Sequence, residues 1–356
     1  MFLLNMKAIR LVIPSLVFFV CFTTAFAQQE DTLPVLPQNA ADAKSDFNMI
    51  LRGMRSYDFA VQSGEGECLY VFRQLGIPET YSTWKAHLTF DPGHTRIEFE
   101  DSISNNTQMP RATLISTPSG TLEITYPETG KPDYQFRRNA QHPDDLQRNN
   151  QTDTGLDGSR SWVDPRRWLH IVDGKDLPTY LKEQNFRILK SEFFNGFPCY
   201  VLEAKIDAEP LPDHQQDDNF ERIWVSPELG LRLLKYESRF LRETESPDGQ
   251  IKKGTLFVRR IRISYELHGE DAWLVKNGIA ETLWIDSEGA EHLISRAIIE
   301  TQNFIVNREI PRHIFTADIP DNAMIQVEAL DKKLSKNEFR QWYDEIHLEG
   351  IRLIED

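Results

Sequence analysis

The chain has 356 residues and a formal charge of −15 at pH 7. This acidic balance argues against nucleic acid or an anionic membrane surface as the main partner, because both attract basic proteins. With three cysteines in the whole chain, the fold is not a disulfide scaffold.

Residues 1–27 have the three parts of a cleavable secretory signal peptide. Lys7 and Arg10 precede an apolar stretch from Leu11 to Phe22, and Ala25-Phe26-Ala27 follows as a small-residue cleavage site. We expect cleavage after Ala27. This removes 27 of the 356 residues and two positive charges, so that 329 residues remain and the formal charge falls from −15 to −17.

Two other readings of this N-terminal segment are a membrane anchor and a lipoprotein anchor. The apolar stretch is shorter than the roughly 20 residues that a spanning helix needs. Cys21 could carry a lipid, but Val20 and Phe18 stand where that signal requires a small residue and usually leucine. Export as a soluble protein is therefore the expectation.

The next segments predict a linker and then a helix. Residues 28–40 contain two prolines and few large apolar side chains, which is typical of a flexible linker. From Ala41 to Tyr57, apolar residues recur at the spacing of one helix face, starting at Phe47 and Ile50.

From Glu67 the period of the apolar residues changes from about 3.6 to 2, which predicts strands. Trp84, Leu88 and Phe90 share one face, and after the turn at Asp91-Pro92-Gly93 the same face continues with Ile97 and Phe99. Further strands are expected at 114–117, 121–126 and 134–138. The polar segment 139–158 reads as an exposed loop. Short helices are expected from Asp164, with Pro165 at the first position, and at 177–184.

The β pattern resumes at Phe186 and continues to Val327. The clearest strand runs from 257 to 266, where Phe257, Ile261, Ile263 and Tyr265 share a face that Arg259 interrupts. The other strands are expected at 197–206, 219–225, 231–240, 279–285, 294–305 and 324–327, with a tight turn at 248–249. Short connections favour antiparallel pairing, so we predict a mainly β domain over 41–330, built as a large curved sheet or unclosed barrel. Residues 331–356 read as a charged, helical extension.

Signatures of catalysis are missing from the chain. It has no metalloprotease, serine-hydrolase, phosphate-loop or Cys-x-x-Cys motif, and the many carboxylates do not single out a glycosidase pair. His87 and His94 flank one hairpin and are expected to be solvated. The segment 153–164 matches a calcium loop only in part, because Gly155 offers no ligand at the third place. We therefore expect no enzyme activity, no metal and no cofactor.

The two cysteines of the mature chain are expected to lie on opposite strand faces. Alternation puts Cys199 on the side of Glu203, whereas Cys68 shares a side with Tyr70. We predict that the two do not pair.

The most informative feature is the amount of large apolar side chain on one face of many strands. Those faces could fill a sandwich core, or they could line a cavity for an apolar ligand. The candidate ligand-binding residues are Trp84, Leu88, Phe90, Ile97, Phe99, Phe257, Ile261, Ile263 and Tyr265.

Short stretches resemble the outer-membrane lipoprotein-sorting superfamily, the LolA/LolB/RseB-like fold. The segment 220–236 contains Trp224-Val-Ser-Pro227 followed by a Gly230 turn and a return strand, and Ile314-Phe-Thr-Ala-Asp-Ile-Pro320 is similar to the closing stretch of the family. The turn at 248–249 and the first helix also agree.

The resemblance implies an unclosed antiparallel barrel with lid helices, whose concave side takes up lipid or lipoprotein acyl chains in the periplasm. It thus implies a carrier or binding protein with lipid or acylated lipoprotein as partner, and no nucleic acid. An envelope signalling or protein-interaction module on the same fold is the alternative, and a hydrolase is a third. Fold alone does not decide between them, and the oligomeric state stays open.

Overall fold

The computed structural model describes residues 34, 40–57, 61–75, 79–105, 107–138, 164–165, 168, 177–206, 219–245, 251–269, 272–286 and 288–346. The predicted signal peptide, the polar loop 139–158, most of the calcium-like segment 153–164 and the turn at 248–249 lie outside these residues.

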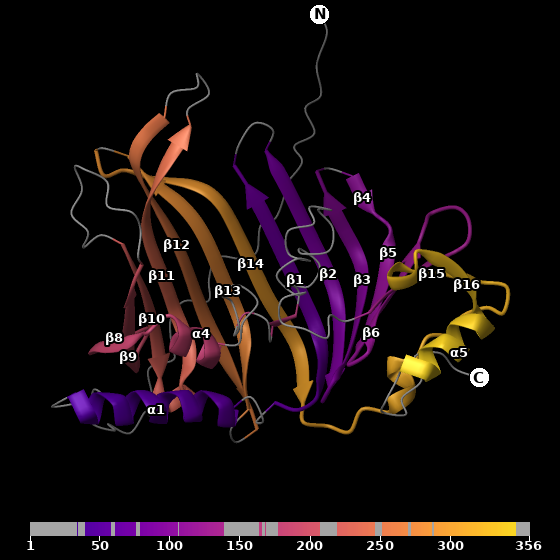
Figure 1. Ribbon diagram of the computed structural model, residues 1–356, viewed down its shortest axis with the longest axis horizontal. Coiled ribbons are helices and arrows are strands. Elements are labelled where there is room, and N and C mark those ends of the chain that lie inside the picture. Colours follow the sequence, from indigo (N-terminus) through magenta and orange to yellow (C-terminus); the bar gives the residue numbers. More distant parts are fainter. Residues whose placement is uncertain are drawn as a thin grey trace, which may run out of the picture. The chain divides into compact units, whose positions relative to one another are not determined.

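Sixteen strands form one sheet, in which β4 pairs with β3 beside the main path. The order along that path is β16-β15-β7-β6-β5-β3-β2-β1-β14-β13-β12-β11-β10-β9-β8. All neighbours are antiparallel except β7 and β15, which run parallel. The path begins at β16 and ends at β8, so the sheet does not close into a barrel, and Figure 1 shows it curving. The predicted fold class is confirmed.

The strands of the first half are β1 (Gly64–Gln74), β2 (Thr80–Asp91), β3 (His94–Ser104), β4 (Thr107–Met109), β5 (Arg111–Thr117), β6 (Gly120–Tyr126) and β7 (Asp133–Arg138). Those of the second half are β8 (Arg187–Phe194), β9 (Phe197–Lys205), β10 (Phe220–Ser226), β11 (Arg232–Glu245), β12 (Ile251–His268), β13 (Ala272–Ile285), β14 (Glu291–Val306), β15 (Met324–Val327) and β16 (Lys332–Ser335).

Three α-helices are present in the described part of the chain, α1 (Ala40–Tyr57), α4 (Leu177–Glu183) and α5 (Lys336–Ile346). All three fall where the sequence predicts helices. Short 3-10 turns occur at η4 (Pro227–Leu229), η5 (Arg312–Phe315) and η6 (Glu328–Leu330). Around the helix expected from Asp164, Pro165 and Trp168 have 3-10 geometry.

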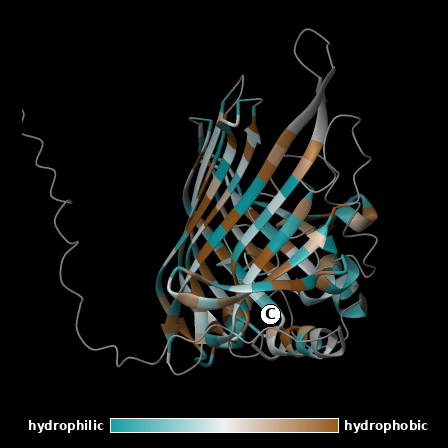
Figure 2. Cartoon of the chain, turned by 90° about the vertical axis from the view of Figure 1, so that its left-hand side faces the viewer, coloured by the Kyte–Doolittle hydropathy of each residue, from teal (hydrophilic) through white to brown (hydrophobic). Residues whose placement is uncertain are grey.

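The sheet has two faces with different partners. We call the face that carries Trp84, Phe99, Ile263 and Ile299 the inner face, because these side chains form the largest hydrophobic cluster together with those of α1 and α4. The opposite face is the outer face. Figure 2 shows hydrophobic and hydrophilic residues alternating along the strands, as expected when the two faces differ.

Near β5 to β7, the C-terminal segment, which comprises residues 310–319 and α5, covers the outer face. Phe315, Ile319 and Phe339 pack there against Ile115 and Phe136, in a second hydrophobic cluster. Arg96 on β3 holds this segment on the sheet. Its Nη1 donates hydrogen bonds to the carbonyl oxygens of Ile314 and Thr316, at 2.9 and 3.1 Å. The predicted extension from residue 331 is therefore part of the fold, with β16 in the sheet and α5 on its outer face.

The two described cysteines occupy different clusters. Cys68 belongs to the inner-face cluster, whereas Cys199 lies with Val201 and Trp224 in a third cluster near β8 to β10. The prediction that they lie on opposite faces is confirmed.

Candidate functional site: the inner face of the sheet

Helix α1, helix α4 and Trp168 are packed on the inner face. Ile50 of α1 and Leu181 of α4 are fully buried in the inner cluster, because both helices turn an apolar side towards the sheet. Trp168 packs closely on Gly278 of β13, where a Cβ atom would come within 2.6 Å of the indole carbon Cε3. Gly278 therefore allows the close approach of Trp168 to the strand.

Most of the nine predicted ligand-binding residues meet in one place. Seven of them lie in the inner cluster and are at most 6% exposed: Trp84, Leu88, Phe90, Ile97, Phe99, Ile261 and Ile263. Trp84 and Phe99 pack edge to face, with ring centroids 5.7 Å apart. Tyr265 packs against the same cluster and donates a hydrogen bond to the carbonyl of Leu233 at 2.7 Å.

Phe257 is the exception, because it lies beyond the cluster and stacks on Phe240 instead, with centroids 5.8 Å apart. The predicted set therefore forms mainly the packed floor of the inner face.

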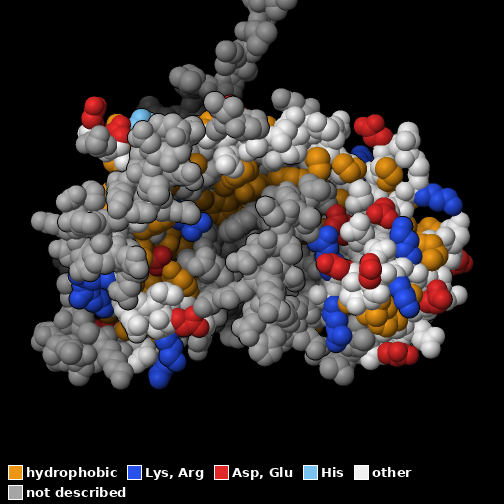
Figure 3. Space-filling view, turned by 45° about the horizontal axis from the view of Figure 1, so that its top comes forward, with side chains coloured by type: hydrophobic (Ala, Val, Ile, Leu, Met, Phe, Trp, Pro, Cys, Tyr) orange, Lys and Arg blue, Asp and Glu red, His pale blue; other side chains and the backbone are white. Residues whose placement is uncertain are grey.

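The apolar side chains that stay partly accessible are different ones. Phe72, Met109, Leu114, Ala280 and Ala297 pack against the inner cluster without being fully buried. Direct cross-strand pairing places Ala280 beside Ala297 and Ala297 beside Phe72. Small side chains in adjacent strands fill less space than their larger neighbours, so we expect the surface to be lower at this pair. Figure 3 shows a hollow lined by hydrophobic side chains.

Sequence reasoning missed these positions because single alanines in a strand give no signal of a lining role.

One carboxylate fixes α4 to the inner face. Glu221 on β10 accepts hydrogen bonds from Tyr180 on α4 and from Tyr236 on β11, the latter at 3.0 Å. Burial, and then the negative charge of Glu221, raises the pKa of the Tyr236 phenol well above its ordinary value. Tyr236 therefore stays a protonated donor. Through Glu221, the two tyrosines hold α4 on the sheet.

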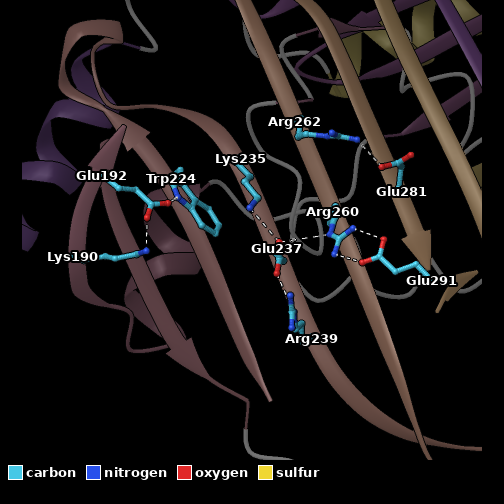
Figure 4. A network of polar contacts seen from close by, with 10 residues as sticks. All are labelled: Lys190, Glu192, Trp224, Lys235, Glu237, Arg239, Arg260, Arg262, Glu281 and Glu291. Atoms are coloured by element: carbon cyan, nitrogen blue, oxygen red, sulfur yellow. Dashed lines mark hydrogen bonds and ion pairs between the residues drawn. The ribbon is translucent and has the colours of Figure 1, made fainter. Parts of the chain in front are cut away.

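The outer face of β11 to β14 carries a network of ion pairs. Glu237 is bridged by Lys235 at 3.2 Å, by Arg239 at 3.0 Å and by Arg260 at 3.6 Å, and Figure 4 shows how these side chains meet. Burial opposes the ionisation of Glu237, but the three cations outweigh it and hold its pKa below the ordinary value.

The network continues along the same face. Arg260 also pairs with Glu291 at 2.6 Å, and Glu281 holds Arg262 and Arg296 at 2.8 and 2.6 Å. Arginines and carboxylates thus neutralise one another on the outer face.

The prediction that His94 is solvated is wrong. The imidazole is buried, its Nδ1 lies 2.8 Å from Asp91 Oδ1, and the ring packs on Phe315. The reason is the C-terminal segment, whose cover over the outer face the hairpin pattern does not reveal. His87 is half-buried.

Within the described residues, no three His, Cys, Asp or Glu side chains are grouped so that they could hold a metal. No helix in that part of the chain has the length and hydropathy to cross a membrane.

Neither a protein-family model nor a curated protein matches the sequence. Several solved structures do resemble the chain. A DUF1329 family protein from Desulfovibrio piger is 14% identical over 77% of this chain and 96% of its own length, with a TM-score of 0.41. A LolA superfamily protein from Nitrosomonas europaea is 12% identical over 76% and 97%, with a TM-score of 0.35.

A domain from Vibrio parahaemolyticus, assigned to outer membrane lipoprotein sorting, is 10% identical over 76% of this chain and 97% of its own, with a TM-score of 0.32.

Proposed function

We propose that this protein is an exported carrier or binding protein that takes up the acyl chains of a lipid or lipoprotein on its inner face and catalyses no reaction. The observation that carries the proposal is the apolar hollow in Figure 3, together with the partly buried Phe72, Ala280 and Ala297 that pack against the inner cluster. An aqueous compartment would otherwise leave such a surface in contact with water, which is unfavourable.

The size of the hydrophobic effect fits this role. Each methylene group that leaves water contributes about 0.8 kcal/mol, so ten buried methylenes contribute roughly 8 kcal/mol before the loss of chain entropy. Binding of this kind needs apolar area and few directional contacts. The inner face provides such area beside the packed floor of Ile261 and Ile263.

The direct test is native mass spectrometry of the purified mature protein, followed by titration with a fluorescent fatty-acyl probe. We expect co-purified lipid and saturable probe binding. Ala297→Trp should weaken probe binding at least tenfold, because the indole would fill the dip beside Phe72. Ala290→Trp adds the same side chain at an exposed turn and is the matched control.

Absence of lipid and of probe binding in the parent protein would overturn the proposal. Capture of one stoichiometric protein partner in place of lipid would favour the signalling or interaction module. The export part of the proposal is tested separately by N-terminal sequencing, which should give Gln28 as the first residue, and an intact Met1 would contradict it.

A further inference from the structure

The inner face of β11 to β14 is layered into three rows of side chains. Residues of one row are direct neighbours across adjacent strands. The first row consists of Tyr236, Ile261, Ala280 and Ala297. The second row lies two residues away from the first along each strand. It is polar and consists of Ser238, Arg259, Thr282 and Ser295. The third row is aromatic and consists of Phe240, Phe257, Trp284 and His292.

Arg259 is the unusual member of the polar row. Its neighbours along the strand, Arg260 and Arg262, point to the outer face and are neutralised there by carboxylates. Arg259 instead shares a face with Ile261 and Ile263 and is exposed. Among the described side chains on the inner face of β9 to β14, it is the one cation, and no described carboxylate forms an ion pair with it.

The acidic group of the same row does not neutralise Arg259. Glu221 is paired with Ser238, which in turn is paired with Arg259, so two strand spacings, about 10 Å, separate their backbones. The Glu221 carboxylate is also engaged by Tyr180 and Tyr236. A positive charge is therefore available beside the apolar row.

The aromatic row borders Arg259 on the side away from the apolar row. Phe240 and Phe257 stack with an interplanar angle of 14°, and Trp284 stacks on His292 with centroids 4.1 Å apart. Trp284 is 36% exposed, so the row still offers an apolar surface. The apolar row followed by a cation is the order that the hydrocarbon chain and charged end group of an amphiphile would match.

We propose that Arg259 is a headgroup subsite and that it binds the carboxylate or phosphate of an anionic ligand whose acyl chain lies on the apolar row. This inference rests on the proposed function and adds the charge of the ligand to it. The shared chemistry is an oxyanion at the end of a long hydrocarbon chain. Arginine suits this role because its planar guanidinium donates two parallel hydrogen bonds to such a group.

The test compares three probes with one chain length, hexadecanoate, hexadecyl phosphate and uncharged hexadecanol, in competition with a neutral fluorescent acyl ester at about pH 8. The parent protein should bind at least one of the two anions about tenfold more tightly than the alcohol, which is the size of one charge-assisted contact. The anion that binds more tightly identifies the source, a fatty acid or a phosphate headgroup.

Three variants assign the preference to one residue. Arg259→Gln should bring the anions to the affinity of hexadecanol and leave hexadecanol binding unchanged, while Arg259→Lys should keep part of the preference. Arg262→Gln removes the same charge from the outer face of the same strand, where Arg296 still holds Glu281, and should keep the full preference. Thermal unfolding should not change in Arg259→Gln, because the side chain is exposed.

The outcomes separate this inference from the function on which it rests. Equal binding of all three probes by the parent, or an undiminished preference in Arg259→Gln, would overturn the headgroup subsite and leave the acyl-chain carrier intact. If none of the probes binds, including hexadecanol, both proposals are overturned.

Discussion

Replacing Ile263 with alanine should destabilise the protein strongly while leaving acyl-probe binding in place. Ile263 is 1% exposed and belongs to the inner cluster, directly across from Gly278, on which Trp168 lies. The substitution removes three buried carbon atoms, worth roughly 2.4 kcal/mol at about 0.8 kcal/mol each. A residual cavity adds to this, because close-packed neighbours relax only in part. We expect a total loss of about 3 kcal/mol in the free energy of unfolding.

Urea-induced unfolding, followed by tryptophan fluorescence, measures this loss as a fall in the midpoint at unchanged slope. Ile305→Ala is the matched control, because it makes the same chemical change at a side chain that is 51% exposed, and it should alter stability by less than about 0.5 kcal/mol. Probe binding is measured on both variants without urea.

A loss below about 1 kcal/mol at Ile263, combined with weakened probe binding, would refute this reasoning. It would mean that Ile263 lines the ligand cavity itself, and the division between a packed floor and an accessible row would then be wrong.

Three further predictions concern other contacts. Gly278→Ala should lower the thermal midpoint by several degrees in differential scanning calorimetry, because its Cβ would clash with Trp168, and an unchanged midpoint would show that the indole does not lie there. Glu237→Gln should destabilise most at neutral pH and least below about pH 4 in urea titrations. The lowered folded pKa of Glu237 means that its contribution is present above the unfolded value of about 4.5 and is lost as the pH falls through the folded value; a pH-independent effect would contradict this. Burial raises the pKa of the Cys199 thiol to about 12, so a thiol reagent at neutral pH should label Cys199 only after denaturation. Cys68 should then react as well, giving two thiols per mature chain. Fewer than two would contradict the placement on opposite faces.

The fold was predictable where one side of a strand meets a core and the other meets water. The alternation of Trp84, Leu88 and Phe90 is reproduced as buried positions on one face, and α1 buries the stripe that begins at Phe47. Short polar or weakly periodic strands gave no such signal. Thus β4 and β16 were not predicted, because Thr107-Gln-Met109 and Lys332-Lys-Leu-Ser335 are mainly polar and show no alternation of apolar residues.

The candidate site was predictable only in part, because alternation shows which residues share a face but not how deeply they are buried. Periodicity found Ile261 and Ile263, which form the floor. It could not find Ala280 and Ala297, whose role comes from their small size next to larger neighbours. The sequence shows Arg259 as an interruption of the apolar face. That it lies in a polar row follows only from its pairing with β11 and β13 and from the pairing of β13 with β14.

The way in which the outer face is covered explains why the hollow lies on the inner face. In β5 to β7 the outer side chains, such as Ile115 and Phe136, are buried by the C-terminal segment. In β9 the outer positions Cys199 and Val201 are also buried, so almost the whole strand is inaccessible on both faces. Between these regions the outer face of β11 to β14 carries the ion pairs of Glu237 and Glu281, which apolar chains cannot displace without leaving charges unpaired. A ligand held on the inner face by its acyl chain would meet Arg259, with which no described carboxylate forms an ion pair.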